Sequence, residues 1–251
     1  MAQQTAGNID DVLEEILDYQ VDGIVLASVA MSSVLAERCD AAGIPVVLFN
    51  RAQQEDRFST VTSDNFAGGK ALAEFLVAGG HRRIGYIAGW EGASTQRDRE
   101  AGFCAGLAEH GHKLFARGVG DFRTETAAKA ARAMFSASEF PDAVFVANDH
   151  MAFAVIEELR GNLGLRVPED VSVVGYDDVQ LSRWSSFDLT TVRQPSGEMV
   201  AETVAALMAQ IEDGETEPRR VKIDGPLVVR GSARRPADWK AYWKECDDER
   251  L

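Results

Sequence analysis

Polar side chains that could bind a small molecule follow most of the short apolar runs in this sequence. They are Ser28, Asn50, Asp64, Asn148, Asp149, Asp177 and Asp178, and Trp90 adds a flat apolar face. Hydroxyl, amide and carboxylate groups offer hydrogen-bond donors and acceptors, and an aromatic ring can cover the apolar face of a sugar or a nucleobase. These residue types therefore predict a site for a small polar molecule.

Several of these residues also have a purely structural interpretation. Asp64 and Asp149 each precede an expected helix, where such residues often cap the N-terminus. We interpret Asp149 chiefly as a cap, and Asp64 equally as a cap or as a ligand contact. Asn148 and Asp177 fit capping less well, so we expect them to contact the ligand. Trp90 is either a packed aromatic or part of the site.

Residue patterns typical of catalysis are not found in this sequence. It has no Gly-x-Ser-x-Gly elbow, Walker loop or dinucleotide-binding glycine motif. His110 and His112 follow an expected helix without a third ligand nearby, which indicates a solvated turn rather than a metal site. Asp177 and Asp178 would point to opposite faces of a strand, so they would not share a substrate. We therefore expect no enzyme, no cofactor and no metal.

The elements that would position these side chains alternate along the chain. Short β-branched runs at 23–28, 45–50, 83–89, 143–148 and 171–177 are expected to be strands covered on both faces. Between them, apolar stripes within 12–17, 72–76, 151–159 and 200–211 have helical spacing, and Gly43, Gly80 and Gly111 stand where helices should end. The alternation predicts an α/β fold with mostly parallel sheets, in which ligands bind beyond the carboxyl ends of the strands.

The composition narrows the class of protein. The chain has 251 residues, 45% of them hydrophobic, which allows one large α/β domain or two smaller lobes. Its net charge of -14 opposes binding to bare nucleic acid. Three cysteines without metal-ligand spacing indicate reduced thiols. No secretory signal pattern and no membrane-spanning apolar run are present in the sequence, so we expect a cytoplasmic protein.

An ordered series of motifs resembles the LacI/GalR family of bacterial transcription regulators across nearly the whole chain. The motifs are VTSDNFAGG at 61–69, GHRRIG at 80–85, REAGF at 99–103, GDF at 120–122, ANDHMA at 147–152, VPEDVSVVGYDD at 167–178, LTTVRQ at 189–194 and LVVRGS at 227–232. Each motif alone is weak. All of them together, in this order and at this spacing, are a strong signal.

The resemblance implies a type I periplasmic-binding-protein fold, in which two parallel-sheet lobes are joined by three crossings of the chain. We place the N-terminal lobe at 1–80 and 194–214, the C-terminal lobe at 81–193 and 215–238, and a tail at 239–251. The crossings are expected near His81, Gln194 and Glu215. Family members begin with a helix-turn-helix head and a strand-helix-strand segment. This chain opens just before a helix expected at Asp10–Tyr19, so the head is expected to be absent and the first lobe incomplete.

The resemblance also implies roles for single residues. Arg99 falls at an effector-binding arginine of the family, although an exposed helix arginine such as Arg97 is the plain alternative. Phe122 matches an aromatic that stacks on a sugar or base, with core packing as its alternative. Asn148 and Asp177 match cleft hydrogen-bonding positions of the family, and Asp64 and Asn50 match contacts from its first lobe. Trp90 is included because it stands at a strand end. The full predicted effector site comprises Arg99, Phe122, Asn148, Asp177, Asp64, Asn50 and Trp90.

These inferences lead to one expected function and one alternative. We expect the effector-binding and dimerisation core of a LacI-type transcriptional regulator, a repressor that senses a small polar molecule, foremost a sugar. Its expected partners are this effector, a second copy in a homodimer, and operator DNA only through a head absent from the chain. The alternative is a solute-binding protein of a sugar transporter, which shares the fold. The motifs at 80–84 and 171–178, and the lack of a secretory pattern, favour the regulator.

Overall fold

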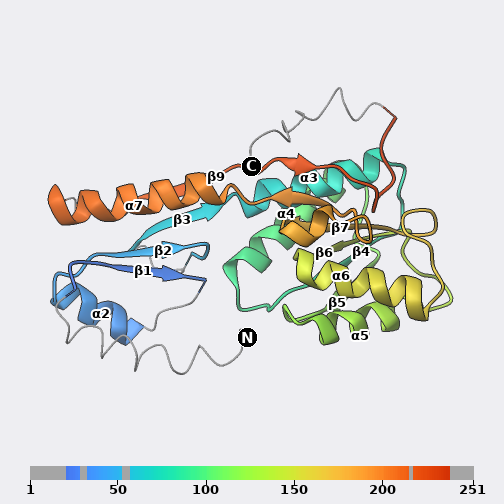
Figure 1. Cartoon of the computed structure of the whole chain (residues 1–251), viewed down its shortest axis with the longest axis horizontal. Coiled ribbons are helices and arrows are strands. Elements are labelled where there is room, and N and C mark those ends of the chain that lie inside the picture. Colours follow the sequence, from blue (N-terminus) through green and yellow to red (C-terminus); the bar gives the residue numbers. More distant parts are fainter. Residues whose placement is uncertain (1–20, 29–32, 53–56, 215–216, 238–251) are drawn as a thin grey trace. The chain divides into compact units, whose positions relative to one another are not determined.

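The computed structural model describes residues 21–28, 33–52, 57–214 and 217–237, which fall into two compact units. Unit 1 comprises the described residues of Met1–Ser63 and Pro195–Ile223, and unit 2 those of Asp64–Gln194 and Asp224–Leu251. Each unit contains its own sheet with helices on its faces (Figure 1). The helix expected at Asp10–Tyr19 and the tail expected from residue 239 lie outside the described residues.

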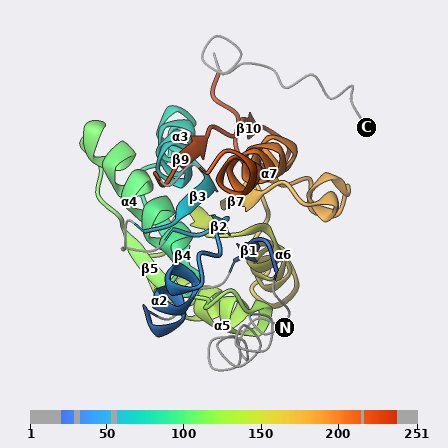
Figure 2. The same cartoon turned by 90° about the vertical axis from the view of Figure 1, so that its left-hand side faces the viewer.

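Unit 1 is built on a parallel four-stranded sheet. Its strands, in spatial order, are β1 (Ile24–Ala27), β2 (Val46–Phe49), β3 (Ser59–Ser63) and β9 (Arg220–Ile223). The helices α2 (Ser33–Ala41) and α7 (Ser196–Glu212) lie on opposite faces of this sheet (Figures 1 and 2). Because side chains alternate along a strand, β2 sends Leu48 to the cluster beneath α2 and Val47 to the cluster beneath α7.

Unit 2 is built on a six-stranded sheet. Its order is β10-β8-β7-β6-β4-β5, and every pairing is parallel except that of β10 with β8. The strands are β4 (Ile84–Ala88), β5 (Ala116–Val119), β6 (Ala143–Val146), β7 (Ser172–Asp177), β8 (Thr190–Arg193) and β10 (Leu227–Val228). The helices are α3 (Asn65–Ala78), α4 (Ser94–Glu109), α5 (Thr124–Phe135) and α6 (Asp149–Glu157), with a π-helical turn at Glu158–Asn162 and a 3-10 turn at Gln180–Arg183.

Three aromatic rings in mutual contact form the centre of the unit 2 core. Tyr86 of β4, Phe103 of α4 and Phe145 of β6 are fully buried, and their ring centroids are 5.0, 5.1 and 5.9 Å apart. These separations suit offset or tilted ring packing. The core therefore packs α4 directly against the neighbouring strands β4 and β6, which are followed by the predicted site residues Trp90 and Asn148.

Helices α3 and α4 approach each other closely along a seam of glycines. A Cβ added at Gly69 would collide with the carbonyl oxygen of Arg99, and one added at Gly102 would collide with that of Phe66. A side chain at either position would force the two backbones apart. The seam explains why α3 belongs with unit 2, whereas the sequence placed residues 65–78 in the N-terminal lobe.

Two of the three expected chain crossings differ from the division of the structure. The first lies after Ser63 rather than near His81, and the third lies after Ile223 rather than near Glu215, because β9 pairs with β3. The crossing expected near Gln194 agrees with the boundary that follows that residue.

The strongest sequence patterns correspond to observed elements. The five apolar runs contain β1, β2, β4, β6 and β7, and the stripes at 72–76, 151–159 and 200–211 lie in α3, α6 with the following π-helical turn, and α7. Gly43, Gly80 and Gly111 end helices at φ angles of 66°, 81° and 73°, a conformation that glycine adopts without steric cost. Helix α4 was not expected as a whole because its buried face includes polar side chains such as Gln96 and Arg99.

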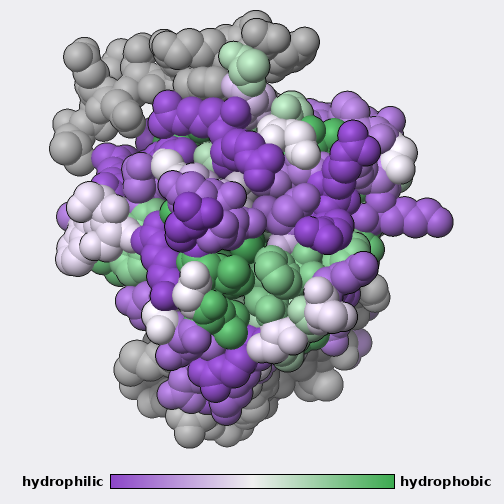
Figure 3. Space-filling model, turned by 90° about the vertical axis from the view of Figure 1, so that its right-hand side faces the viewer, coloured by the Kyte–Doolittle hydropathy of each residue, from purple (hydrophilic) through white to green (hydrophobic). Residues whose placement is uncertain are grey.

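Apolar and polar side chains share the molecular surface. Figure 3 shows one face of the molecule, on which apolar side chains gather near the middle among polar ones. Within the described ranges, none of the helices has the length and apolar composition needed to cross a membrane.

Candidate functional site

Four of the predicted site residues follow neighbouring parallel strands of unit 2. Trp90 comes after β4, Phe122 after β5, Asn148 after β6, and Asp177 ends β7. The strand order β7-β6-β4-β5 places these ends side by side at the carboxyl edge of one sheet. Ligands of open parallel sheets bind at this edge.

Arg99 lies at the centre of this edge and is almost completely buried, with 3% of its side chain exposed. Its Nε donates to Asn65 Oδ1 at 2.8 Å, and one terminal nitrogen donates to the carbonyl oxygen of Ala147 at 2.6 Å. The other terminal nitrogen donates to Asp177 Oδ1 at 3.2 Å. The guanidinium carbon lies 3.7 Å from the ring centroid of Tyr176, a cation–π contact. These contacts exclude the alternative of an exposed helix arginine, which Arg97 does represent.

Asp177 and Asp178 have separate partners, as expected for adjacent side chains. Asp177 Oδ1 also accepts from Gln194 Nε2 at 2.6 Å. Asp178 is fully buried and accepts from Arg193 and Arg230, each at 2.6 Å. Two charge-assisted hydrogen bonds hold Asp178 in place, so Asp178 anchors the loop while Asp177 faces Arg99.

Asp149 was expected to cap the helix that follows it and Asn148 was not, but the structure shows the reverse. Asn148 caps α6, because its Oδ1 accepts from Met151 N at 3.0 Å. Asp149 is fully buried and its carboxylate instead accepts from Val179 N, Ser182 Oγ and Thr191 Oγ1 at 3.0, 2.6 and 2.7 Å. A short polar side chain at either position looks like a cap in the sequence, and only the tertiary contacts separate the two.

Burial shifts the ionisation of Asp149. Desolvation and, to a lesser degree, the negative charge of Asp177 raise its pKa to about 6, against the opposing effect of its three donors. Desolvation penalises the charged form of a buried carboxylate. Asp149 therefore connects α6 to the segment that follows β7 and to β8, and it does not itself reach solvent.

The two predicted aromatic residues differ in burial. Phe122 is half-buried and packs partly on the unit 2 core, with its ring so close to Gly89 that a Cβ there would collide with it. Trp90 is 42% exposed, and its ring lies over Gly92. Phe122 thus packs on the core while staying partly exposed, and Trp90 is not a core residue.

Unit 1 contributes a smaller polar pair at its own carboxyl edge. Asn50 Nδ2 donates to Ser28 Oγ at 3.2 Å, and these residues follow the paired strands β2 and β1. Asn50 Oδ1 is shielded from solvent without a hydrogen-bond partner, although buried polar atoms are usually paired. The role of Asn50 as an effector contact remains a prediction.

Unusual backbone angles concentrate at the carboxyl ends of strands. Of seven described non-glycine residues with positive φ, six follow or end strands: Ser28, Asn50, Asp121, Phe122, Asp177 and Asp178. Such conformations cost free energy and are common at ligand sites. Both sheets therefore carry strained backbone at the edge where the sequence places the ligand.

Asp64 and a group of unpredicted residues support this edge. Asp64 caps α3, since its Oδ1 accepts from Ala67 N at 2.9 Å, which confirms the capping interpretation. Asn65 and Tyr176 contact Arg99 but were not singled out, and neither was Gln96, whose Oε1 accepts from Tyr86 Oη and Gly89 N at 2.8 and 2.6 Å. The paired glycines that bring α3 against α4 are the signal that could have indicated Asn65.

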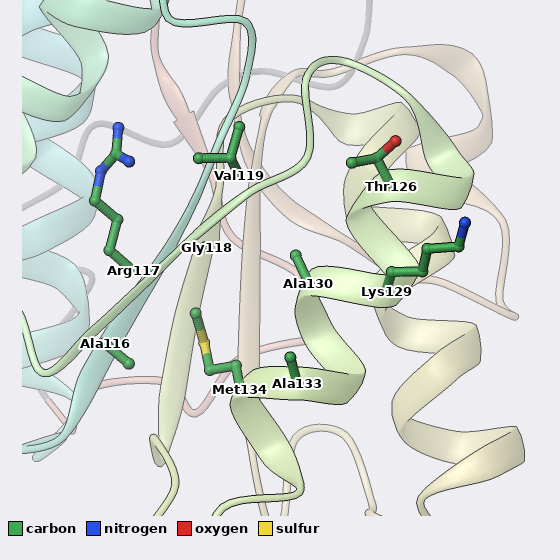
Figure 4. Close-up of a pocket in the computed structure, with 9 residues that line it drawn as sticks. All are labelled: Ala116, Arg117, Gly118, Val119, Thr126, Lys129, Ala130, Ala133 and Met134. Carbon is green, nitrogen blue, oxygen red and sulfur yellow. The ribbon is translucent and has the colours of Figure 1, made fainter.

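A separate hollow of about 510 Å³ lies between β5 and α5. Figure 4 shows Ala130 and Met134 of α5 facing the strand, near Gly118, with Thr126 and Lys129 on the same helix. It contains none of the predicted effector residues. In the described part of the chain, no group of three or more His, Cys, Asp or Glu residues is arranged to hold a metal ion.

Comparison with known proteins identifies the family. Residues 73–233 match the family described as "Periplasmic binding protein-like domain". The HTH-type transcriptional regulator CelR of Thermobifida fusca is 37% identical over 219 residues, covering 84% of this chain and 63% of CelR. The HTH-type transcriptional repressor PurR of Photobacterium profundum is 30% identical over 236 residues, covering 92% of this chain and 70% of PurR.

Solved structures agree with the sequence relatives. The complex of the transcriptional regulator CelR with cellobiose has a TM-score of 0.84 and 32% identity, covering 92% of this chain and 71% of that one. A LacI transcriptional regulator from a Rhodococcus species has a TM-score of 0.81 and 27% identity, covering 89% and 82%. The chain therefore belongs to the LacI/GalR family of transcriptional regulators, whose periplasmic binding protein-like domain it carries.

Proposed function

We propose that this chain is the effector-binding and dimerisation core of a LacI-type transcriptional repressor that senses a sugar. The observation that carries the proposal is the pair formed by the buried Arg99 and the partly buried Asp177 at the carboxyl edge of unit 2. Two charged groups held at such an edge are costly to bury unless they are paired and hydrogen-bonded, and a polar ligand can complete their hydrogen bonding.

The chemistry of this edge suits a polyhydroxylated ligand. Protein acceptors use three donors of the Arg99 guanidinium, which leaves donors for ligand oxygens. Asp177 accepts from Arg99 and Gln194 on Oδ1, so Oδ2 can accept from a hydroxyl. The ring of Phe122 can cover an apolar sugar face. Asn148, Trp90 and Asp64 complete the proposed site in unit 2, and Asn50 is proposed separately as an effector contact of unit 1.

The relatives support a regulator rather than a solute-binding protein or an enzyme. CelR and PurR carry names of HTH-type transcription regulators, and the CelR structure contains cellobiose. We therefore propose that the chain acts in the cytoplasm, and that operator DNA is bound by a helix-turn-helix head outside this chain. The net charge of -14 agrees with the absence of direct DNA contacts by these residues.

A thermal-melting screen tests the effector proposal. Cellobiose, other mono- and disaccharides and nucleobases are added to the purified chain. At a hundredfold excess over its dissociation constant, a ligand adds about 2.7 kcal/mol of stability, which raises the melting temperature by roughly 5–10 °C. We expect a sugar to give this shift and Arg99→Ala to abolish it.

The matched control is Arg97→Ala, two residues away on the same helix. Arg97 is exposed and donates to the carbonyl oxygen of Gly92 at 2.9 Å, so its loss should leave the ligand-induced shift intact. A melting-temperature shift that persists in both Arg99→Ala and Asp177→Ala would place the site elsewhere. If only nucleobases raise the melting temperature, the proposed effector class is a nucleobase and not a sugar.

We also propose that the working form is a homodimer. This part of the proposal is carried over from the LacI/GalR family, whose cores pair side by side. Light scattering on the purified chain should give twice the mass of one chain. A monomer at high concentration would contradict this part of the proposal.

A further inference from the structure

We propose that Asn65 is a positioning residue, which holds the Arg99 guanidinium in the orientation that leaves Asp177 open to the effector. This inference rests on the proposed function and deepens it. Asn65 is the first residue of α3 and is 3% exposed. Its Oδ1 accepts from Arg99 Nε at 2.8 Å, although the two residues are 34 positions apart in the sequence.

Three contacts fix the guanidinium from different directions. Asn65 Oδ1 accepts a hydrogen bond from Nε, the carbonyl oxygen of Ala147 accepts one from a terminal nitrogen, and the ring of Tyr176 covers one face of the group. Since the guanidinium is planar and rigid, these contacts together fix both the position and the rotation of its fork. Only the second terminal nitrogen then reaches Asp177, at 3.2 Å.

This single contact is unusual for an arginine beside a carboxylate. Arginine and carboxylate groups commonly pair through two parallel hydrogen bonds, which are shorter and stronger than one. Such a pair would use both oxygens of Asp177 and leave none for a ligand hydroxyl. By holding Nε away from Asp177, Asn65 prevents the fork from closing on the carboxylate.

The close approach of helices α3 and α4 allows Asn65 to reach Arg99. Gly69 and Gly102 bring α3 and α4 together, because a Cβ at either would collide with the carbonyl oxygen of the facing helix. Gly68 makes room for the Tyr176 hydroxyl, since a Cβ there would lie 2.6 Å from the oxygen. The same seam that closes the two helices therefore places Asn65 and Tyr176 on Arg99.

The experiment measures binding of a probe sugar, cellobiose first, by isothermal titration to the whole chain and its variants. Asn65→Ala removes the acceptor without adding bulk, and we expect about tenfold weaker binding, which corresponds to roughly 1.4 kcal/mol. Asn65→Asp keeps an acceptor for Nε and should restore affinity to within about threefold of the original chain. Leu72→Ala, in the buried face of α3 away from Arg99, should lower the melting temperature but not the affinity.

Coupling to Arg99 separates positioning from a general structural role. In an Arg99→Lys background, which keeps a cation but has no Nε donor for Asn65, Asn65→Ala should change the affinity no further, because the hydrogen bond that it removes is already gone. An equal loss of affinity in both backgrounds would overturn the inference, as would Asn65→Ala binding as tightly as the original chain.

A second measurement needs no ligand and so separates this inference from the proposed function. The Arg99 Nε proton, followed by nitrogen-15 NMR, should exchange slowly in the original chain and in Asn65→Asp, and rapidly in Asn65→Ala. If no probe sugar binds but this pattern holds, the sugar proposal fails and the positioning role stands. If Nε exchange is unchanged in Asn65→Ala, the positioning role fails whatever ligand binds.

Discussion

Unit 2 and unit 1 use the same strand-helix alternation but bury their side chains to different extents. In unit 2, α3, α4, α5 and α6 cover a six-stranded sheet, and one continuous apolar cluster extends through strands and helices alike. In the described residues of unit 1, a four-stranded sheet separates two smaller clusters, one beneath α2 and one beneath α7. Because apolar burial is the main favourable contribution to folding, unit 2 should be the more stable of the two.

In unit 1, several exposed apolar side chains gather on one helix. On α7, Val200, Val204, Met208 and Ile211 are 38–54% exposed, and Val25 on the edge strand β1 is 45% exposed. The residues that α7 buries, Met199, Thr203 and Ala206, lie on the opposite face of the helix. Similar secondary structure therefore does not imply similar burial of side chains. We expect substitutions in the two units to change the free energy of unfolding by different amounts.

The largest expected difference comes from core deletions. Phe145→Ala removes the ring shared by Tyr86 and Phe103 in unit 2 and should lower the free energy of unfolding by about 3–5 kcal/mol. Leu48→Ala in unit 1 should cost about 2–5 kcal/mol, but it should affect unit 1 alone. Hydrogen exchange followed by mass spectrometry on peptides from each unit measures both effects. Equal loss of protection in both units from either substitution would mean that they unfold as one body.

A smaller difference is expected in the dependence of stability on pH. Desolvation, followed by Arg234, lowers the pKa of the buried His81 against the opposing effect of Asp142. The unfolded chain then takes up a proton near pH 6.5 while the folded chain resists it, so this group makes unit 2 less stable as the pH falls below 6.5.

Asp149 acts in the opposite direction in the same unit. Its pKa is about 6 when folded, against an ordinary value near 3.8. The folded chain takes up this proton first, so Asp149 contributes relative stability as the pH falls from 6 to 4, on the order of 2–3 kcal/mol. Asp149→Asn should remove that gain, and His81→Gln should remove the loss. Urea unfolding followed by the fluorescence of Trp90 and Trp184, with Trp239 and Trp243 replaced by Phe, reports on unit 2. Identical pH profiles for both variants and the original chain would contradict both assignments.

The smallest effect is expected on the exposed face of α7. Val204→Ala should change the free energy of unfolding by less than about 0.5 kcal/mol, since the side chain is 54% exposed. Met199→Ala, on the buried face of the same helix, should cost about 2–5 kcal/mol. Chemical denaturation measures both. A large loss from Val204→Ala would show that this face is covered in solution.

The sequence alone determined much of the fold. Continuous β-branched runs have few other solutions than buried parallel strands, so β1, β2, β4, β6 and β7 were predictable. The alternation with helical stripes fixed the α/β class, and the motif series fixed the family. Arg99, Phe122, Asn148 and Asp177 were also named from the sequence. The structure places the last three at the ends of neighbouring strands, and Arg99 of α4 contacts Asp177 directly.

Only the tertiary structure decided which hydrogen-bond partners the polar side chains of the site have. Asn148 and Asp149 are adjacent and chemically similar, yet one caps a helix at the surface of the sheet edge and the other accepts three hydrogen bonds in the core. Asn65 reaches Arg99 only because distant glycines let α3 and α4 touch. Apolar periodicity is a local property that a sequence records directly, whereas the partner of a polar group is set by backbone distances between segments far apart in the chain.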